Sequence, residues 1–348
     1  MKKVNIVAWD NGGGLGRDIS IIADSLSRSG YVVYFNGFKS RGHQARISRL
    51  GNYGLLTLQK KLVGFPFHVN IFLERVYSRF LGLASANFLV PNPEWMHEET
   101  VSNLGVIDRV LCKTKYTQKI YQEKGCGTAY IGFTSDDCMQ AQIESKNEED
   151  FIHIAGRNPY KGTKSLIDLW LKHPEWPTLV VVQSPTTYDG EEVVRTKANN
   201  INHILRYLSD DELRAMQNRY RIHLCPSEAE GFGHSIVEAM SCGGLVVTTN
   251  APPMNELLTI ERGVLVKYSK SEPKGYGLRF FVDLHSLEAV VSEIIDMPIQ
   301  KKMGMGERAR NWYQLNDNAF SNRLIKAIEC SESRVPQPGK NSSYSVSL

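Results

Sequence analysis

The strongest constraint on the fold is a pattern of strand, glycine-rich turn, helix and strand that opens the chain. An apolar run at residues 4–9 leads into a turn rich in glycine, residues 11–16. An amphipathic helix is expected from about residue 18 to residue 28, because its apolar residues recur at helical spacing, and a second apolar run follows at residues 31–35. Parallel βαβ units begin in this way, so the pattern predicts the start of a doubly wound α/β domain.

The alternation of strands and helices starts again after residue 150. Strands are expected at 69–73, 87–90, 109–111, 151–155, 178–182, 221–225 and 245–248, and helices at 165–171, 210–218 and 235–240. The polar stretch 136–150 predicts an interdomain linker, and a chain of 348 residues is long enough for two cores. We therefore expect two Rossmann-like α/β domains that face a central cleft, at residues 1–140 and 150–307. A helix at about 308–332 and a disordered tail at 333–348 complete this division.

The composition is that of a soluble globular protein, with 42% hydrophobic and 22% charged residues. The six cysteines form no CxxC pair and no Cys/His cluster at metal-ligand spacing. No apolar stretch approaches the ~20 residues of a spanning helix, and the first residues do not resemble a signal peptide. These features predict a cytoplasmic protein with reduced cysteines and without a metal site or cofactor.

Charge is distributed unevenly along the predicted first domain. Between Asp24 and Glu74 there is no acidic residue, whereas seven residues are basic: Arg28, Lys39, Arg41, Arg46, Arg49, Lys60 and Lys61. Such a segment can attract an anionic acceptor or an anionic membrane, which would place the protein peripherally at the inner membrane face. A solvated basic face is an equally open alternative. Nucleic acid is not expected as a partner, because aromatic residues are not interleaved with the charges.

Two glutamates flank the start of a predicted helix in the second domain. Glu230 lies in a loop that follows the strand at 221–225, and Glu238 lies one to two turns into the helix. Gly231 and Gly233 allow a ligand to approach the backbone closely, and the first amides of the helix are free to bind phosphate oxygens. Carboxylates accept hydrogen bonds from sugar and ribose hydroxyls. The loop therefore predicts a site for a sugar joined to a phosphate.

The spacing of Glu230 and Glu238 resembles the E-x7-E motif of family 4 glycosyltransferases, and the surrounding EGFG and EAM sequences are similar as well. This resemblance implies the GT-B fold, in which two Rossmann-like domains face a cleft and the last helix crosses back to the first domain. It implies that Glu230 contacts the donor sugar and that Glu238 contacts the nucleotide ribose. The backbone near the donor diphosphate would then be that of Gly231, Phe232, Gly233, His234 and Ser235.

A basic loop follows the first strand of the predicted second domain. Arg157 and Lys161 lie on it, and their charges can neutralise a diphosphate as its bond to the sugar breaks. The segment resembles the family's GR…KG loop, whose Arg and Lys bind the donor diphosphate. The gap between the two residues is short here. Taken alone, such a loop is more often a basic surface turn.

The glycine-rich turn near the N-terminus resembles the family's GG.G loop, which faces the donor diphosphate from the first domain. Gly13, Gly14 and Gly16 are therefore expected near the donor, where backbone amides can hold phosphate. A nicotinamide-binding fingerprint fits badly, because Arg17 occupies the position of its third glycine. A tight structural turn is the alternative reading.

Two further loops are weaker predictions. Asn92, Glu94 and His97 follow a first-domain strand and would line the acceptor side of the cleft, although a proline-rich structural turn explains them as well. Lys113 and Lys115 follow the next strand; they could face anionic groups, but solvated side chains are the favoured interpretation.

The segment around Arg206 and Tyr207 resembles the family's loop before the base-binding helix. It predicts contacts with the nucleotide base, with an ordinary surface loop as the alternative. Ser209 and Glu212 fit a capping box at the start of that helix.

Together the motifs predict a retaining, metal-independent, hexosyltransferase-like enzyme of polysaccharide or glycoconjugate synthesis. Its partners would be a nucleotide-sugar donor and a saccharide or lipid-linked acceptor. Metal independence is expected because no Asp-x-Asp triplet occurs in the sequence, and retention follows from the resemblance alone. A GT-B epimerase and a non-catalytic nucleotide-sugar-binding subunit remain alternatives.

Overall fold

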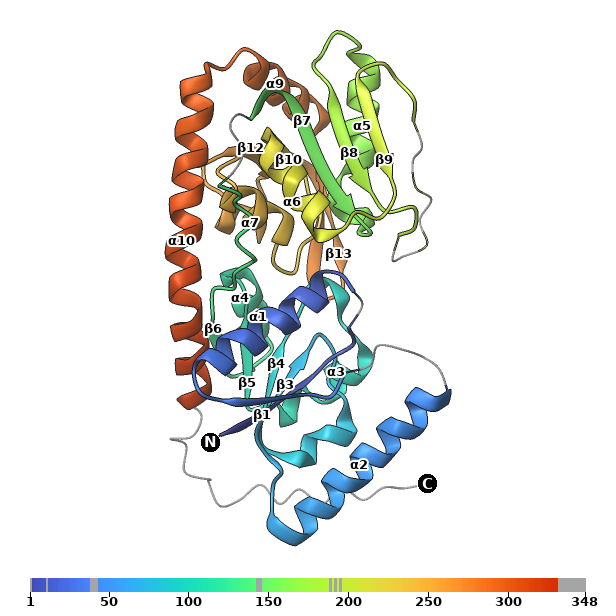
Figure 1. Cartoon of the computed structure of the whole chain (residues 1–348), viewed down its shortest axis with the longest axis vertical. Coiled ribbons are helices and arrows are strands. Elements are labelled where there is room, and N and C mark those ends of the chain that lie inside the picture. The colour runs from blue at the N-terminus through green and yellow to red at the C-terminus, as the bar shows by residue number, and fades with distance from the viewer. Residues whose placement is uncertain are drawn as a thin grey trace.

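The computed structural model describes residues 2–10, 12–37, 43–141, 146–187, 190, 193 and 196–330, without the side chains of residues 43–52. In this part of the chain, two six-stranded sheets stack end to end in an elongated molecule (Figure 1). Every strand pairing within the two sheets is parallel. The predicted α/β class and the predicted pair of Rossmann-like units are therefore confirmed.

The first sheet has the strand order β2-β1-β3-β4-β5-β6. Its strands are β1 (Lys3–Val7), β2 (Val32–Phe35), β3 (Phe67–Leu73), β4 (Ala84–Val90), β5 (Arg109–Cys112) and β6 (Thr128–Tyr130). The helices between them are α1 (Gly14–Arg28), α2 (His43–Val63), α3 (Glu98–Ser102) and α4 (Lys115–Glu123), with short 3-10 turns η1 (Ser78–Leu83), η2 (Pro93–Trp95) and η3 (Leu104–Val106). The inner strands β1, β3 and β4 are the apolar runs of the sequence, and both of their faces are largely covered.

The second sheet has the order β12-β11-β10-β7-β8-β9. Its strands are β7 (Asn147–Gly156), β8 (Leu179–Gln183), β9 (Ile201–Leu205), β10 (Tyr220–Cys225), β11 (Leu245–Thr249) and β12 (Val264–Val266). The accompanying helices are η4 (Pro159–Lys161), α5 (Thr163–Lys172), α6 (Asp210–Arg219), α7 (His234–Ser241), α8 (Met254–Leu257) and α9 (Leu284–Ile295). The capping box at the start of α6 is present as predicted, with Ser209 and Glu212 bonded reciprocally.

Two predicted boundaries are wrong for identifiable reasons. The polar stretch expected to be a linker up to residue 150 enters β7 at Asn147, because the Glu148 carboxylate pairs with Arg221 of the neighbouring strand. Polar residues can therefore extend this strand beyond its apolar centre. Helix α1 begins at Gly14 and not near Asp18, with Gly13 as its N-cap. Part of the predicted glycine turn is thus the first turn of a helix.

Several elements have no counterpart in the sequence prediction, and two of them matter for the arrangement of the first domain. One is α2, and the other is an antiparallel hairpin formed by β13 (Tyr268–Lys274) and β14 (Gly277–Val282). The hairpin reaches the first domain, where the backbone N–H of Tyr276 donates to the Pro93 carbonyl at 2.7 Å. A Cβ on Gly275, whose φ is +58°, would lie 2.4 Å from the same carbonyl oxygen. The tip of the hairpin therefore requires glycine.

Helix α10 (Ile299–Glu329) runs along both domains (Figure 1). It begins before the expected residue 308, and it packs on α7 and β11 of the second domain and on α1 and β6 of the first. The Tyr313 hydroxyl donates to the Ser135 carbonyl at 3.0 Å, and Arg323 donates to the carbonyls of Ile131 and Gly132. The tail predicted at 333–348 lies outside the described residues.

The domains share one hydrophobic core cluster in this structure. At its centre Phe133, from the segment after β6, makes edge contacts with Phe232 of the glutamate loop and with Phe320 of α10, at ring-centre distances of 5.3 and 5.0 Å. Phe232 is therefore an interdomain packing residue as well as part of the predicted donor loop.

Candidate functional site

The glutamate loop has the strand–turn–helix form that the sequence predicts. Strand β10 ends at Cys225, and α7 begins at His234 after Gly233, whose φ of +116° is a conformation that side chains with a Cβ rarely adopt. Glu230 lies in the turn, and Glu238 follows in the second turn of the helix. The N-terminal amides of α7 therefore lie between the two carboxylates.

Lys161 and Glu230 are brought together although they are far apart in sequence. Their side chains form an ion pair, and Lys161 Nζ also donates to Ser235 Oγ at 3.0 Å. Both side chains are about nine-tenths buried. The loops meet because Gly162 has a φ of +72°, and a Cβ there would lie 2.3 Å from the Pro226 carbonyl. The structure thus places a cation, a carboxylate and a hydroxyl at the start of α7.

Arg157 lies on the same loop as Lys161 and is half-buried. Hydrogen bonds from Ser184 and Thr186, together with the charge of Arg157, lower the pKa of the Tyr207 hydroxyl. Tyr207 is largely exposed, and its hydroxyl lies 3.3 Å from Thr186 Oγ1. The predicted diphosphate and base loops are therefore neighbours.

Arg206, the other residue predicted near the base, is engaged with its own helix. Its guanidinium pairs with the Glu212 carboxylate at 2.7 Å on the surface. A base contact by Arg206 stays a prediction, and it would compete with this ion pair.

Glu238 is held by groups from both domains. Its Oε1 atom pairs with Arg17 Nη1 at 2.8 Å and accepts from Ser135 Oγ at 3.3 Å, while Gln217 Nε2 donates to Oε2 at 2.9 Å. The carboxylate is almost fully buried. Sequence reasoning used Arg17 only to reject a nicotinamide fingerprint and did not place it at the site.

A chain of polar side chains continues from α7 into the first domain. His234 Nε2 lies 2.9 Å from Asp18 Oδ1, and the other Asp18 oxygen pairs with Lys113. Lys113 Nζ also donates to Asn92 Oδ1 at 2.8 Å, and the Asn92 amide donates to Glu74. Five side chains from both domains therefore form one connected network, which we call the interdomain polar network.

Burial and charge act in opposite directions on Asp18. Burial alone would raise its pKa, but Lys113 and His234 beside it hold the pKa below its usual value. Lys113, which was expected to be solvated, has only 3% of its surface exposed. That expectation was wrong, because Lys113 is the counter-charge of a buried carboxylate.

Glu74 has the positive φ of +59°, a strained conformation for a residue with a side chain. It directly follows β3, and burial raises the pKa of its carboxyl. No local sequence pattern indicates its position in the network. The recurrence of polar residues directly after adjacent strands is the signal that would have indicated Glu74.

The predicted glycines allow the two domains to approach closely. A Cβ on Gly231 would lie 2.1 Å from Asn92 Oδ1, across the domain boundary. A Cβ on Gly14 would lie 3.8 Å from the His234 ring, and one on Gly16 would lie 2.8 Å from Asp10 Oδ1. Gly13 caps α1 beside them. The glycine turn and the glutamate loop therefore face each other.

The predicted acceptor residues do not all lie together. Asn92 belongs to the interdomain polar network, and Glu94 next to it is buried. Burial, with the neighbouring carboxylates of Glu74 and Glu230, raises the pKa of Glu94 to about 8. His97 lies at the N-cap of α3, where partial desolvation of its ring, together with the charge of Arg75, lowers its pKa.

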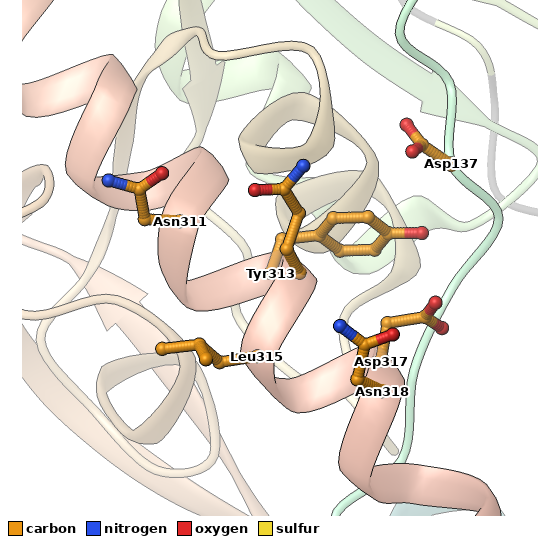
Figure 2. Close-up of a pocket in the computed structure, with 7 residues that line it drawn as sticks. Asp137, Asn311, Tyr313, Leu315, Asp317 and Asn318 are labelled. Atoms are coloured by element: carbon orange, nitrogen blue, oxygen red, sulfur yellow. The ribbon is translucent and has the colours of Figure 1, made fainter.

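A surface pocket lies away from these residues. It is formed along α10 and the segment after β6, and its lining residues are Asp137, Asn311, Tyr313, Gln314, Leu315, Asp317 and Asn318 (Figure 2). Figure 2 shows acids and amides at its rim, and the lining includes none of the residues predicted to bind donor or acceptor. Over the described ranges, no group of three or more His, Cys, Asp and Glu side chains is arranged to hold a metal ion.

Comparison with known protein families gives a match in the second domain. The family glycosyl transferases group 1 matches residues 135–279, which include Arg157, Lys161 and both motif glutamates. This part of the chain is similar to group 1 glycosyltransferases. The resemblance drawn from the E-x7-E spacing is thereby confirmed.

A curated relative of the chain is the phosphatidylinositol N-acetylglucosaminyltransferase gpi3 subunit of Schizosaccharomyces pombe. It is 25% identical over 199 residues, which cover 55% of this chain and 41% of the relative. The match therefore spans about two fifths of that relative's length.

Solved structures confirm the GT-B architecture over nearly the whole chain. Sucrose-phosphate synthase from Thermosynechococcus elongatus superposes with a TM-score of 0.68 at 12% identity, covering 95% of this chain and 99% of that one. HepE of Anabaena, solved in complex with UDP and glucose, gives a TM-score of 0.63 at 14% identity, covering 94% and 99%. At these identities the likeness establishes the fold alone.

Proposed function

We propose that the protein is a retaining glycosyltransferase that moves a sugar from a nucleoside-diphosphate donor to an acceptor hydroxyl. The observation that carries this proposal is the convergence of Lys161, Glu230 and Ser235 at the N-terminus of α7. A helix N-terminus favours phosphate, and a buried lysine beside it adds positive charge where charge develops as the bond to the diphosphate breaks. The similarity of the second domain to group 1 glycosyltransferases supports the same reading.

In this proposal each motif residue has a separate task. Arg157 and Lys161 stabilise the departing diphosphate, and Glu230 orients the sugar by accepting hydrogen bonds from its hydroxyls. Glu238 accepts hydrogen bonds from the ribose. Its carboxylate has about four lone-pair sites, so it can keep Arg17, Ser135 and Gln217 as partners and still bind one hydroxyl.

The transfer step needs no dedicated side-chain base. The acceptor oxygen forms a bond to the anomeric carbon on the face from which the diphosphate leaves, and the bond between that carbon and the diphosphate oxygen breaks. The acceptor proton passes to the leaving diphosphate. Charge neutralisation by Arg157, Lys161 and the amides of α7 makes the reaction independent of a metal ion.

The acceptor is proposed to be a saccharide or a lipid-linked molecule bound on the first-domain side. Asn92 and Glu94 face the glutamate loop there and offer hydrogen bonds to hydroxyl groups. A lipid acceptor is favoured by the name of the yeast relative, whose substrate is a phosphatidylinositol. Such an acceptor would bring the enzyme to a membrane surface, where glycoconjugates are assembled.

A thermal-shift panel tests the donor assignment directly. Nucleoside diphosphates and nucleotide sugars that bind the folded state should raise Tm. At a hundredfold excess of ligand over Kd, binding adds about 2.7 kcal/mol to the free energy of unfolding. The shift should vanish in Glu238→Ala and be reduced in Lys161→Met. A panel without any shift for the wild type would refute the donor site. Turnover of the donor with and without acceptor then separates a transferase from an epimerase or a non-catalytic binding subunit.

A further inference from the structure

Helix α2 exposes leucines along one face. The exposed fractions of Leu55, Leu58 and Leu62 are 67%, 53% and 73%. At 3.6 residues per turn, these three positions fall within a sector of about 60° around the helix axis. Val63 and Phe65, 76% and 54% exposed, continue the apolar surface past the end of the helix. We call these five residues the α2 patch.

The opposite face of α2 attaches the helix to the first domain. Tyr53 and Leu56 pack against the core cluster beneath the helix, and the Tyr53 ring lies 6.1 Å from that of Phe80. The helix is therefore attached through this inner face, while the leucines of the α2 patch are exposed. Figure 1 shows α2 at the outer edge of the first domain, away from the second domain and from α10.

All fully charged residues in the sequence of α2 are basic. The sequence of α2 contains no acidic residue, and its basic residues are Arg46, Arg49, Lys60 and Lys61. Lys60 Nζ lies 5.2 Å from the centre of the Phe65 ring, so a cation directly borders the apolar surface. Basic residues beside exposed leucines and a phenylalanine are the composition of a helix that lies in the interface of an anionic bilayer.

We propose that the α2 patch docks the protein on an anionic lipid bilayer, with α2 in the plane of the membrane surface and its leucines buried among the acyl chains. A second copy of the chain fits this surface less well, because a symmetric contact of α2 with α2 would bring like charges together. Attachment does not depend on the donor chemistry. The proposal rests on the proposed function in one respect only: a lipid-linked acceptor would lie in the membrane on which the protein docks.

The proposal differs from attraction by charge alone. Surface charges act through solvent and are screened by salt, whereas burial of leucine is not. Binding should therefore weaken at high salt without disappearing. In addition, none of the described residues forms a helix long and apolar enough to cross the bilayer, so docking would be confined to one leaflet.

Co-sedimentation of the full chain with vesicles tests the proposal. Phosphatidylcholine vesicles with and without phosphatidylglycerol are compared at low and high salt. We expect the wild type to pellet with the anionic vesicles, and the variant Leu55→Ser, Leu58→Ser, Leu62→Ser to bind them about tenfold more weakly or worse, since each leucine loses its apolar burial. Leu315→Ser is the matched control, because Leu315 is 73% exposed on α10 and lies outside the patch.

A second pair of variants separates docking from damage. Leu62→Glu should weaken binding to anionic vesicles more than Leu62→Lys does, because only the glutamate repels the lipid headgroups. Donor-induced thermal shifts, measured on each variant, report the fold and the donor site independently of vesicles. Equal pelleting of the wild type and the triple variant would overturn the proposal. The proposal would also be overturned if the wild type did not bind vesicles but self-associated, and the triple variant lost that self-association.

Discussion

The second domain supplies its part of the site from two short stretches of sequence, whereas the first domain supplies its part from four separate strand ends. Glu230, His234 and Glu238 lie within nine residues, and Lys161 joins them from one other loop. The partners in the first domain follow β1, β3, β4 and β5, which are neighbours in the sheet. They are Arg17, Asp18, Glu74, Asn92 and Lys113.

This difference decides what a sequence reveals. A strand–loop–helix motif keeps its residues at fixed spacing, so its chemistry can be read along the chain. A cluster built at the carboxyl ends of adjacent parallel strands has no such spacing, because the connections between strands vary in length. If the comparison holds, changes in the first domain should mainly lower stability, and changes in the second domain should mainly slow the donor chemistry.

The largest expected effect is on stability, at Asp18. In Asp18→Ala the buried Lys113 ammonium loses its counter-charge, and the free energy of unfolding should fall by about 3–5 kcal/mol. Urea denaturation measures this loss. Asp24→Ala is the control, since Asp24 is an exposed acid on the same helix and should change stability by less than about 0.5 kcal/mol. Similar losses in both variants would show that Asp18 has no special role.

The next effect is on the rate, at Lys161. Lys161→Met and Glu230→Gln should each lower kcat/KM by about 10²–10³, as expected when a preorganised charge is removed from a reacting centre. Lys164→Met, an exposed lysine of the following helix, should leave the rate within about twofold. Because the Lys161–Glu230 pair is buried, Tm is measured for every variant. A variant that only melts earlier and turns over normally would make the pair structural.

A smaller effect is expected in the pH dependence of stability. Glu94 keeps its proton in the folded state up to about pH 8, whereas in the unfolded chain it loses the proton near 4.5. Between these values the folded state binds more protons, so stability should decrease as pH rises from about 4.5 to 8. A single group of this kind changes the free energy of unfolding by at most about 1.4 kcal/mol for each pH unit in this window.

Glu94→Gln should flatten this part of the profile, and Glu98→Gln, an exposed neighbour, should not. Denaturation midpoints across this pH range provide the measurement. A wild-type profile that is flat or rises in this window would mean that Glu94 is ionised in the folded protein.

The smallest expected effect is that of a chelator. Transfer should proceed at an unchanged rate in EDTA, because Arg157, Lys161 and the amides of α7 supply the charge that a metal would otherwise supply. If activity were lost in EDTA and restored by manganese or magnesium, a metal ion and not these side chains would neutralise the diphosphate.

The sequence predicted the α/β alternation, the order of the domains and the glutamate loop, because each of these is a local pattern of apolar period and turn residues. It did not predict α2 or the β13–β14 hairpin, since neither has a motif that separates it from a loop. It placed Lys113 in solvent because a lysine after a strand is usually exposed. The buried partner that reverses this outcome, Asp18, lies ninety-five residues away.

Helix α10 also gives the two domains a second covalent connection. The chain passes between the domains twice, once in the segment after β6 and once along α10, and Tyr313 and Arg323 bond these two passages to each other. Because these two passages are bonded to each other, they connect the domains along the side of the molecule that α10 covers.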